Sequence, residues 1–190
     1  MKRLIATLFL ISTVLTSYAA DSEKEGLATI VFMRSSLVGA AIKTSIYEVT
    51  NEETIFIGIM KNKTKINHKT SAGKHTFMVV SEAADFMEAD VVAGKTYYSM
   101  ITPRPGAWKA RFSMIPVKND GTTDFNTSSK KFEKWKKKTK VVSEDDKSKA
   151  WYQDHKDSVE EKRAKYWDKW IQKSAEDLAA RTLNANDGVE

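Results

Sequence analysis

The residues best suited to chemistry in this chain are the lysines between positions 130 and 140. This segment contains seven lysines and one glutamate, which gives it a local formal charge of +6. Phe132 and Trp135 are three residues apart, so both would lie on one face of a helix, flanked by lysines. A basic helix with an aromatic wedge is typical of contact with an anionic surface. The predicted contact residues are Lys130, Lys131, Phe132, Lys134, Trp135, Lys136, Lys137, Lys138 and Lys140.

Two interpretations of this segment stay open. In the first, it contacts anionic lipid or polysaccharide. In the second, it is a solvated helix whose two aromatic side chains pack on the rest of the protein. Nucleic acid would suit the charge, but the use of lysine rather than arginine argues against base recognition, and so does the expected export of the chain. We therefore expect no nucleic-acid partner.

A second candidate is an aromatic stripe further along the chain. From Glu144 to Trp170, eight acidic and seven basic side chains nearly cancel, so this segment is poorly suited to an anionic lipid surface. Its apolar and aromatic residues recur at helical spacing. We expect this face to dock on a protein surface, either the N-terminal half of the same chain or a partner. The stripe consists of Trp151, His155, Val159, Tyr166, Trp167 and Trp170.

Arg34 is a third candidate, because it ends an apolar segment and opens a glycine-containing loop. One interpretation is an arginine that binds an anion or a carboxylate through its two-pronged guanidinium group. The other is a structural ion pair with Glu82 or Glu88 that fixes the end of a strand.

Catalysis has weaker support. Asp85, Glu88 and Asp90 lie near one expected strand, and a pair of carboxylates is the machinery of glycoside hydrolysis, so an envelope glycan hydrolase is one alternative. No nucleophile elbow, metalloprotease helix or phosphate-binding loop is present in the sequence. The three histidines are far apart and there is no cysteine to complete a zinc site. We therefore predict a protein that is not an enzyme and that uses no cofactor or metal.

The N-terminus resembles a secretory signal. Lys2 and Arg3 precede an apolar run from Leu4 to Leu15, and Ser17 and Ala19 supply a small-x-small cleavage site. This predicts a signal peptide over residues 1–19, whose removal lowers the formal charge by two, from +6 to +4. No cysteine follows the cleavage point. We expect a periplasmic or secreted protein without a lipid anchor or a transmembrane segment.

The remaining sequence divides into two parts that must position these residues. Seven of the eight glycines and all three prolines precede position 122, and they separate short segments rich in β-branched and aromatic residues. This predicts a small antiparallel β-sandwich over residues 20–120. From Ser128 to Leu183 there is neither glycine nor proline, which predicts a charged α-helical region over 121–190 with Ser143 as an N-cap. Asn184 to Gly188 should form a frayed end.

Two segments of the first part are alike. Ala72-Gly73-Lys74-His75-Thr76 and Ala93-Gly94-Lys95-Thr96-Tyr97-Tyr98 both place Ala-Gly-Lys directly before an expected strand. Together with Ile30-Val31-Phe32-Met33-Arg34, they resemble a bacterial family of exported β-domains known as domain of unknown function 2846. The resemblance covers Ala28 to Val117. It implies an exported β-domain and brings no activity with it.

Taken together, these patterns predict an exported binding or adaptor module of the bacterial cell envelope. Its basic segment would contact anionic lipid or polysaccharide. The alternatives are a protein-interaction subunit that docks through its aromatic helix, and the glycan hydrolase that would use Asp85, Glu88 and Asp90.

Overall fold

The computed structural model describes residues 26–104 and 110–190. The predicted signal peptide lies outside this part of the chain. The strands are β1 (Leu27–Arg34), β2 (Thr44–Val49), β3 (Thr54–Met60), β4 (Thr64–Ser71), β5 (Gly73–Val80), β6 (Ala84–Val91), β7 (Thr96–Arg104), β8 (Arg111–Pro116), β9 (Lys140–Val141) and β10 (Thr182–Leu183). The α-helices are α2 (Lys130–Lys138), α3 (Asp146–Ile171) and α4 (Ala175–Ala179), and a 3-10 turn, η1, spans Ala185–Asp187.

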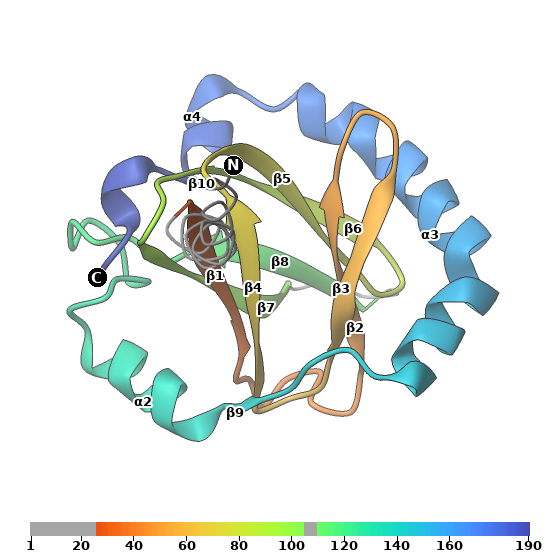
Figure 1. The fold of residues 1–190 in the computed structure, drawn as a ribbon, viewed down its shortest axis with the longest axis horizontal. Coiled ribbons are helices and arrows are strands. Elements are labelled where there is room, and N and C mark those ends of the chain that lie inside the picture. The colour runs from red at the N-terminus through yellow and green to blue at the C-terminus, as the bar shows by residue number, and fades with distance from the viewer. Residues whose placement is uncertain (1–25, 105–109) are drawn as a thin grey trace, which may run out of the picture.

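Within the described residues, the strands form two five-stranded sheets (Figure 1). Sheet A has the order β8-β7-β1-β4-β9, and sheet B has the order β10-β6-β5-β2-β3. The prediction of a mainly β protein with a C-terminal helix is confirmed. Pairing is mixed, because β1–β7, β4–β9 and β6–β10 are parallel while the other pairs are antiparallel.

The main core lies between the two sheets. Alternate residues of each strand point inward, as the two-residue period of a strand requires. Phe32 of β1 meets Phe77 of β5 edge to face, with 5.3 Å between the ring centroids, and neither side chain is exposed. Complete burial of a side chain of this size stabilises a fold by about 1.5–3 kcal/mol. The same core includes Ile30, Ile46 and Met87.

Each sheet has a helix on its outer face. Phe132 of α2 packs with Val31 and Met33 on sheet A. Val159 and Trp170 of α3 pack with outward-facing residues of sheet B, and Figure 1 shows α3 running along that side of the molecule. The order of layers is therefore α2, sheet A, sheet B, α3.

The region over 121–190 consists of separate helices joined by short strands. Thr139 caps the last turn of α2, since its hydroxyl donates to the Trp135 carbonyl oxygen at 2.8 Å, and the next residues pair with β4 as β9. The helix α3 begins at a different cap from the one predicted. Asp145 and Ser148 satisfy each other's backbone N–H groups in a capping box, whereas Ser143 precedes the helix.

The residues after α4 are anchored rather than frayed. Leu183 of β10 is fully buried beside β6, and Thr96 and Val189 form a β-bridge. Lys118 forms a buried ion pair with Asp187, with 3.0 Å between Nζ and Oδ2. Strands β9 and β10 thus tie the helical region to both sheets.

Candidate functional site

The helix α2 is held on sheet A by its two aromatic residues. Ser129 caps its N-terminus, accepting a hydrogen bond from the Phe132 backbone at 3.0 Å. Phe132 is only 3% exposed and meets Tyr98 edge to face at 4.8 Å between centroids. Trp135 is half-buried and stacks on Phe125 at 5.4 Å. Phe132 therefore faces inward and is not available as a surface contact. Trp135 is only half-buried, and it also lines a surface cavity beside Lys134 and Lys138.

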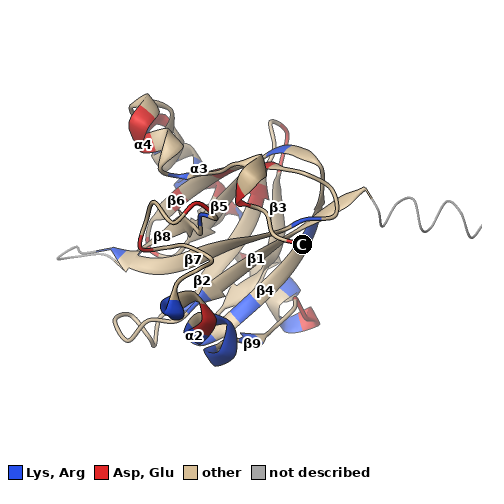
Figure 2. Cartoon of the chain, turned by 90° about the vertical axis from the view of Figure 1, so that its left-hand side faces the viewer, with Lys and Arg blue, Asp and Glu red and all other residues tan. Residues whose placement is uncertain are grey.

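The lysines of this segment remain on the outside. Figure 2 shows the basic positions of α2 gathered along one side of the molecule. Lys136 is the half-buried exception, because it pairs with Glu133 at 2.7 Å and lies over the Phe132 ring at 4.7 Å. Lys131 also pairs with Asp124 at 3.2 Å, but both side chains are well exposed, so this contact is weak. The exposed lysines of the segment are Lys130, Lys131, Lys134, Lys137, Lys138 and Lys140.

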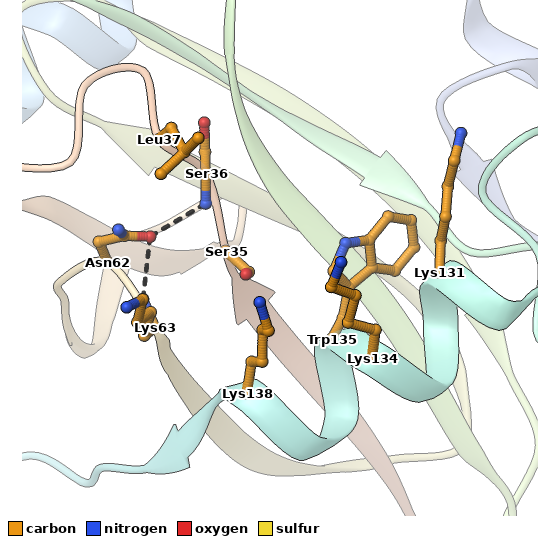
Figure 3. Close-up of a pocket in the computed structure, with 9 residues that line it drawn as sticks. All are labelled: Ser35, Ser36, Leu37, Asn62, Lys63, Lys131, Lys134, Trp135 and Lys138. Carbon is orange, nitrogen blue, oxygen red and sulfur yellow. Dashed lines mark hydrogen bonds between the residues drawn. The ribbon is translucent and has the colours of Figure 1, made fainter.

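Three of these lysines border a cavity of about 320 Å³ (Figure 3). Lys131, Lys134 and Lys138 share one face of α2, and the turn between β3 and β4 contributes Lys63 opposite them. Ser35, Ser36 and Asn62 complete the polar wall. The four ammonium groups and the Ser35 hydroxyl are donors, which is the chemistry that an anionic group such as a phosphate requires.

The loop between β1 and β2 exposes two apolar side chains, one of which borders this cavity. Leu37 borders it and is 93% exposed, and Val38 is 72% exposed. The Ser36 hydroxyl donates to the Val38 carbonyl oxygen at 3.1 Å, and the Ser36 N–H donates to Asn62 Oδ1 at 3.0 Å. The loop is therefore fixed with its apolar side chains directed away from the core. We call Leu37, Val38, Lys63, Lys131, Lys134 and Lys138 the loop–lysine face.

Arg34 holds the other end of this loop. Its side chain is fully buried, and Nη2 donates to the Gly39 carbonyl oxygen at 2.6 Å. Nη1 donates to the Met60 carbonyl oxygen at 3.4 Å, and the guanidinium lies 4.3 Å from the centre of the Phe112 ring. Burial lowers the pKa of Arg34 to about 10, so the group stays charged at neutral pH.

Both predicted roles of Arg34 need correction. Its partners are backbone carbonyl groups, the Thr44 hydroxyl and a ring, and the described residues give it no ion pair with Glu82 or Glu88. A side chain with no exposed surface is also closed to an external anion. The arginine is structural because it fastens the β1–β2 loop.

The aromatic stripe of α3 covers sheet B. Val159 and Trp170 are buried, and Trp151, Tyr166 and Trp167 are half-buried against the same cluster. Tyr152, just beside the predicted stripe, is buried and donates to the Thr54 carbonyl oxygen at 2.8 Å. His155 differs, because it is exposed, stacks on Trp151 at 4.4 Å and hydrogen-bonds through Nδ1 to the Trp151 carbonyl oxygen at 2.8 Å. Of the two surfaces expected for this stripe, the structure shows the protein's own sheet, and docking on a partner stays a prediction.

The three candidate carboxylates do not form one cluster. Asp85 is buried, forms an ion pair with Arg181, and lies 3.8 Å from Arg104. Glu88 and Asp90 follow on β6 at positions of opposite parity, so they project from the other face of the sheet. Of the three, Glu88 and Asp90 line a cleft beside α3, which Glu48 also borders.

A buried ionic network joins three residues that the sequence analysis did not connect. Glu48 accepts from His75 Nδ1 at 2.6 Å through one carboxylate oxygen and from His68 Nε2 at 3.2 Å through the other. The hydrogen bonds from His68 and His75 lower the pKa of Glu48 to about 2, and the bond to Glu48 raises the pKa of His75. The His75 ring also donates to the Ser71 carbonyl oxygen at 2.9 Å. Both ring nitrogens of His75 are thus engaged in hydrogen bonds, which fixes the orientation of the ring.

Over residues 26–104 and 110–190, no group of three or more histidine, aspartate or glutamate side chains is arranged to hold a metal ion. In the same ranges, no helix combines the length and the apolar character needed to cross a membrane.

The chain matches no protein-family model, no curated protein and no solved structure. The resemblance to domain of unknown function 2846 therefore stays a prediction, and the site must be interpreted from its own geometry.

Proposed function

We propose that this chain is an exported, non-enzymatic module that binds the anionic surface of a cell-envelope membrane through the loop–lysine face. The observation that carries the proposal is the position of Leu37, a strongly exposed apolar side chain that borders a cavity with four lysines. Its neighbour in the loop, Val38, is also strongly exposed. Apolar side chains next to a basic surface match the two layers of a membrane interface, its acyl chains and its anionic headgroups.

The electrostatic part of binding is set by Lys63, Lys131, Lys134 and Lys138. Each lysine near an anionic bilayer contributes about 1 kcal/mol, so the four together contribute on the order of 4 kcal/mol. The positive charge is concentrated in one region, because the mature chain is predicted to carry only +4 in total while the segment from 130 to 140 carries +6. The rest of the surface is slightly negative, which favours one orientation on the membrane.

The apolar part favours lipid over polysaccharide. Both ligands offer anionic groups to lysines, but only a bilayer accepts a protruding leucine and valine. Burying a leucine or valine side chain completely contributes about 1.5–3 kcal/mol. The loop is already fixed by Arg34 and Asn62, so insertion requires little further ordering of the backbone.

Co-sedimentation with vesicles tests this proposal. The vesicles contain phosphatidylcholine with about one third phosphatidylglycerol, at about 50 mM and about 500 mM NaCl, where the Debye lengths differ about threefold. We expect binding at low salt that falls strongly at high salt. The triple variant Lys131→Gln, Lys134→Gln, Lys138→Gln should bind about 100-fold more weakly, since three lysines contribute about 3 kcal/mol.

Matched variants distinguish binding at the loop–lysine face from a general effect of positive charge on the protein. Lys147→Gln, Lys156→Gln, Lys165→Gln removes the same charge from exposed positions of α3 and should leave binding within about threefold. Leu37→Ser with Val38→Ser should weaken vesicle binding at least about tenfold. Ile171→Ser, at a residue that is 57% exposed on α3, is its control.

A second arm measures binding to alginate beads, a polysaccharide that offers carboxylates without an apolar layer. The proposal is wrong if the full chain binds alginate but not vesicles, or if the two lysine triple variants lose vesicle binding equally. Vesicle binding that is unaffected by the Leu37 and Val38 substitutions would refute the proposal that these side chains insert into the bilayer.

A further inference from the structure

A second cleft lies on the other side of the molecule, between α3 and the outer face of sheet B. Its volume is about 980 Å³. The strand sequences explain why it opens there. The outward-facing residues of β6 change from Ala84 and Phe86, which pack under the helix, to Glu88 and Asp90. Because acidic side chains do not pack under an apolar stripe, the helix and the sheet separate at this point.

On the neighbouring strand β5, the outward-facing residues also change from apolar to polar. On β5, Thr76 lies opposite Glu88 and Lys74 lies opposite Asp90. These four side chains form a polar floor at the end of the sheet. Trp167 meets Phe86 edge to face, with 5.2 Å between the ring centroids. It lies at the boundary between the packed interface of α3 with sheet B and the cleft.

One end of the cleft is rigid. Arg163 of α3 donates through Nη2 to the Thr50 carbonyl oxygen at 2.7 Å and through Nη1 to the Thr54 hydroxyl at 3.0 Å. The helix is therefore fixed to the β2–β3 turn by a side chain that also borders the cleft. By contrast, the ion pairs found among the described residues include none of Lys74, Glu88 and Asp90.

The charge of the lining indicates the kind of ligand. Lys74 and Arg163 offset Glu88 and Asp90, and the other two ionisable residues of the lining, Glu48 and His75, are hydrogen-bonded to each other. The cleft therefore does not select a strongly charged molecule, unlike the loop–lysine face. It offers hydroxyl, carboxylate and ammonium groups beside an indole ring. Hydroxyl groups of a sugar both donate and accept hydrogen bonds, and the C–H face of a sugar ring packs on an aromatic side chain.

We propose that this cleft binds a neutral oligosaccharide. Its volume is at the upper end of the roughly 300–1,000 Å³ found for small-ligand sites, which suits several linked sugar rings. A peptide is less suited, because extended peptides bind a free sheet edge, and β10 already covers β6 at Glu88 and Ala89. This proposal does not depend on the membrane contact, which uses other residues.

The test measures binding of maltohexaose, cellohexaose and chitohexaose to the full chain by isothermal titration calorimetry, with tryptophan fluorescence as a second signal. We expect one of the three to bind, and binding to persist at about 500 mM NaCl because neutral ligands are not screened. Glu88→Gln with Asp90→Asn keeps the shape of both side chains and should weaken binding at least tenfold. Trp167→Phe should also weaken it and change the fluorescence signal.

The matched control is Asp154→Asn with Asp157→Asn, which alters two exposed acids of α3 away from the cleft lining. It should leave the affinity within about twofold, and melting curves of both double variants should match that of the unchanged protein. The proposal fails if none of the three oligosaccharides binds, or if both double variants lose affinity equally. Vesicle binding is unaffected by either result, so the two proposals fail separately.

Discussion

Replacing Glu48 with glutamine should destabilise the protein in a way that depends on pH. Glu48 lies between two histidines, and its side chain and that of His75 are only 14% and 10% exposed. Glutamine keeps the shape of the side chain but removes its charge, so the ionic hydrogen bonds to His68 and His75 become ordinary ones.

The magnitude follows from the pKa values. Hydrogen bonds from His68 and then His75 lower the pKa of Glu48 from 4.5 to about 2. A difference of this size between the unfolded and folded chain corresponds to a stabilisation on the order of 3 kcal/mol. Because the folded pKa is lower, this stabilisation is fully present above pH 4.5 and disappears as the pH falls towards 2.

His75 sets the upper limit of the pH range. Its pKa is raised above 6.5 in the folded protein, chiefly by the hydrogen bond to Glu48. Its contribution is therefore complete below pH 6.5 and is lost as the pH rises through the folded value. The network stabilises the fold most between about pH 4.5 and 6.5.

Urea unfolding followed by tryptophan fluorescence measures the effect without adding salt. At pH 5.5, Glu48→Gln should lower the free energy of unfolding by about 2–3 kcal/mol. The difference from the unchanged protein should shrink at about pH 2.5 and again at about pH 9. Glu52→Gln, at an exposed turn, is the control and should change stability by less than about 0.5 kcal/mol. A loss for Glu48→Gln that is the same at all three pH values would refute this reasoning.

Three further substitutions test single contacts. Arg34→Lys should lower the free energy of unfolding, measured by urea unfolding, by about 2 kcal/mol. The reason is that an ammonium group cannot bond both carbonyl oxygens and stack on Phe112. An equal loss in the exposed control Arg111→Lys would contradict this. Tyr152→Phe removes the hydrogen bond to Thr54 and should cost about 1 kcal/mol in the same assay, whereas Tyr166→Phe should be nearly neutral. Asp145→Ala removes the N-cap of α3 and should lower the free energy of unfolding by about 1 kcal/mol, which circular dichroism would detect as a lower melting temperature. Asp154→Ala, in the exposed middle of the helix, should leave the melting temperature unchanged.

The sequence predicted those features that depend on local periodicity. The buried residues of α3 recur at helical spacing, so Val159 and Trp170 could be assigned to one face before the structure was known. The strand β4 was not foreseen, because its outward positions are lysine and asparagine and only Ile66 and Thr70 are buried. Sequence patterns detect a strand from its apolar residues, and β4 has few of them.

Features built from distant segments were not predictable in this way. Glu48 and His75 meet because β2 pairs with β5 in sheet B, and His68 joins them from β4 because the two sheets face each other. Similarly, Lys63 joins the lysines of α2 only through the β3–β4 turn. The spacing of residues along the chain indicates neither the histidine–glutamate network nor this group of lysines.

The orientation of α2 shows why a basic aromatic helix does not by itself locate a membrane contact. Sheet A has an apolar outer face, with Val31, Met33 and Met100 buried, and some part of the chain must cover it. Phe132 is the residue of α2 that does so, and its burial directs the lysines of the helix outward. Trp135 lines the same cavity but is half-buried, whereas Leu37 borders the lysines and is 93% exposed, without a role in the core. Helix periodicity thus decides which residues are buried, but the position of the β1–β2 loop decides where an apolar side chain meets the charged face.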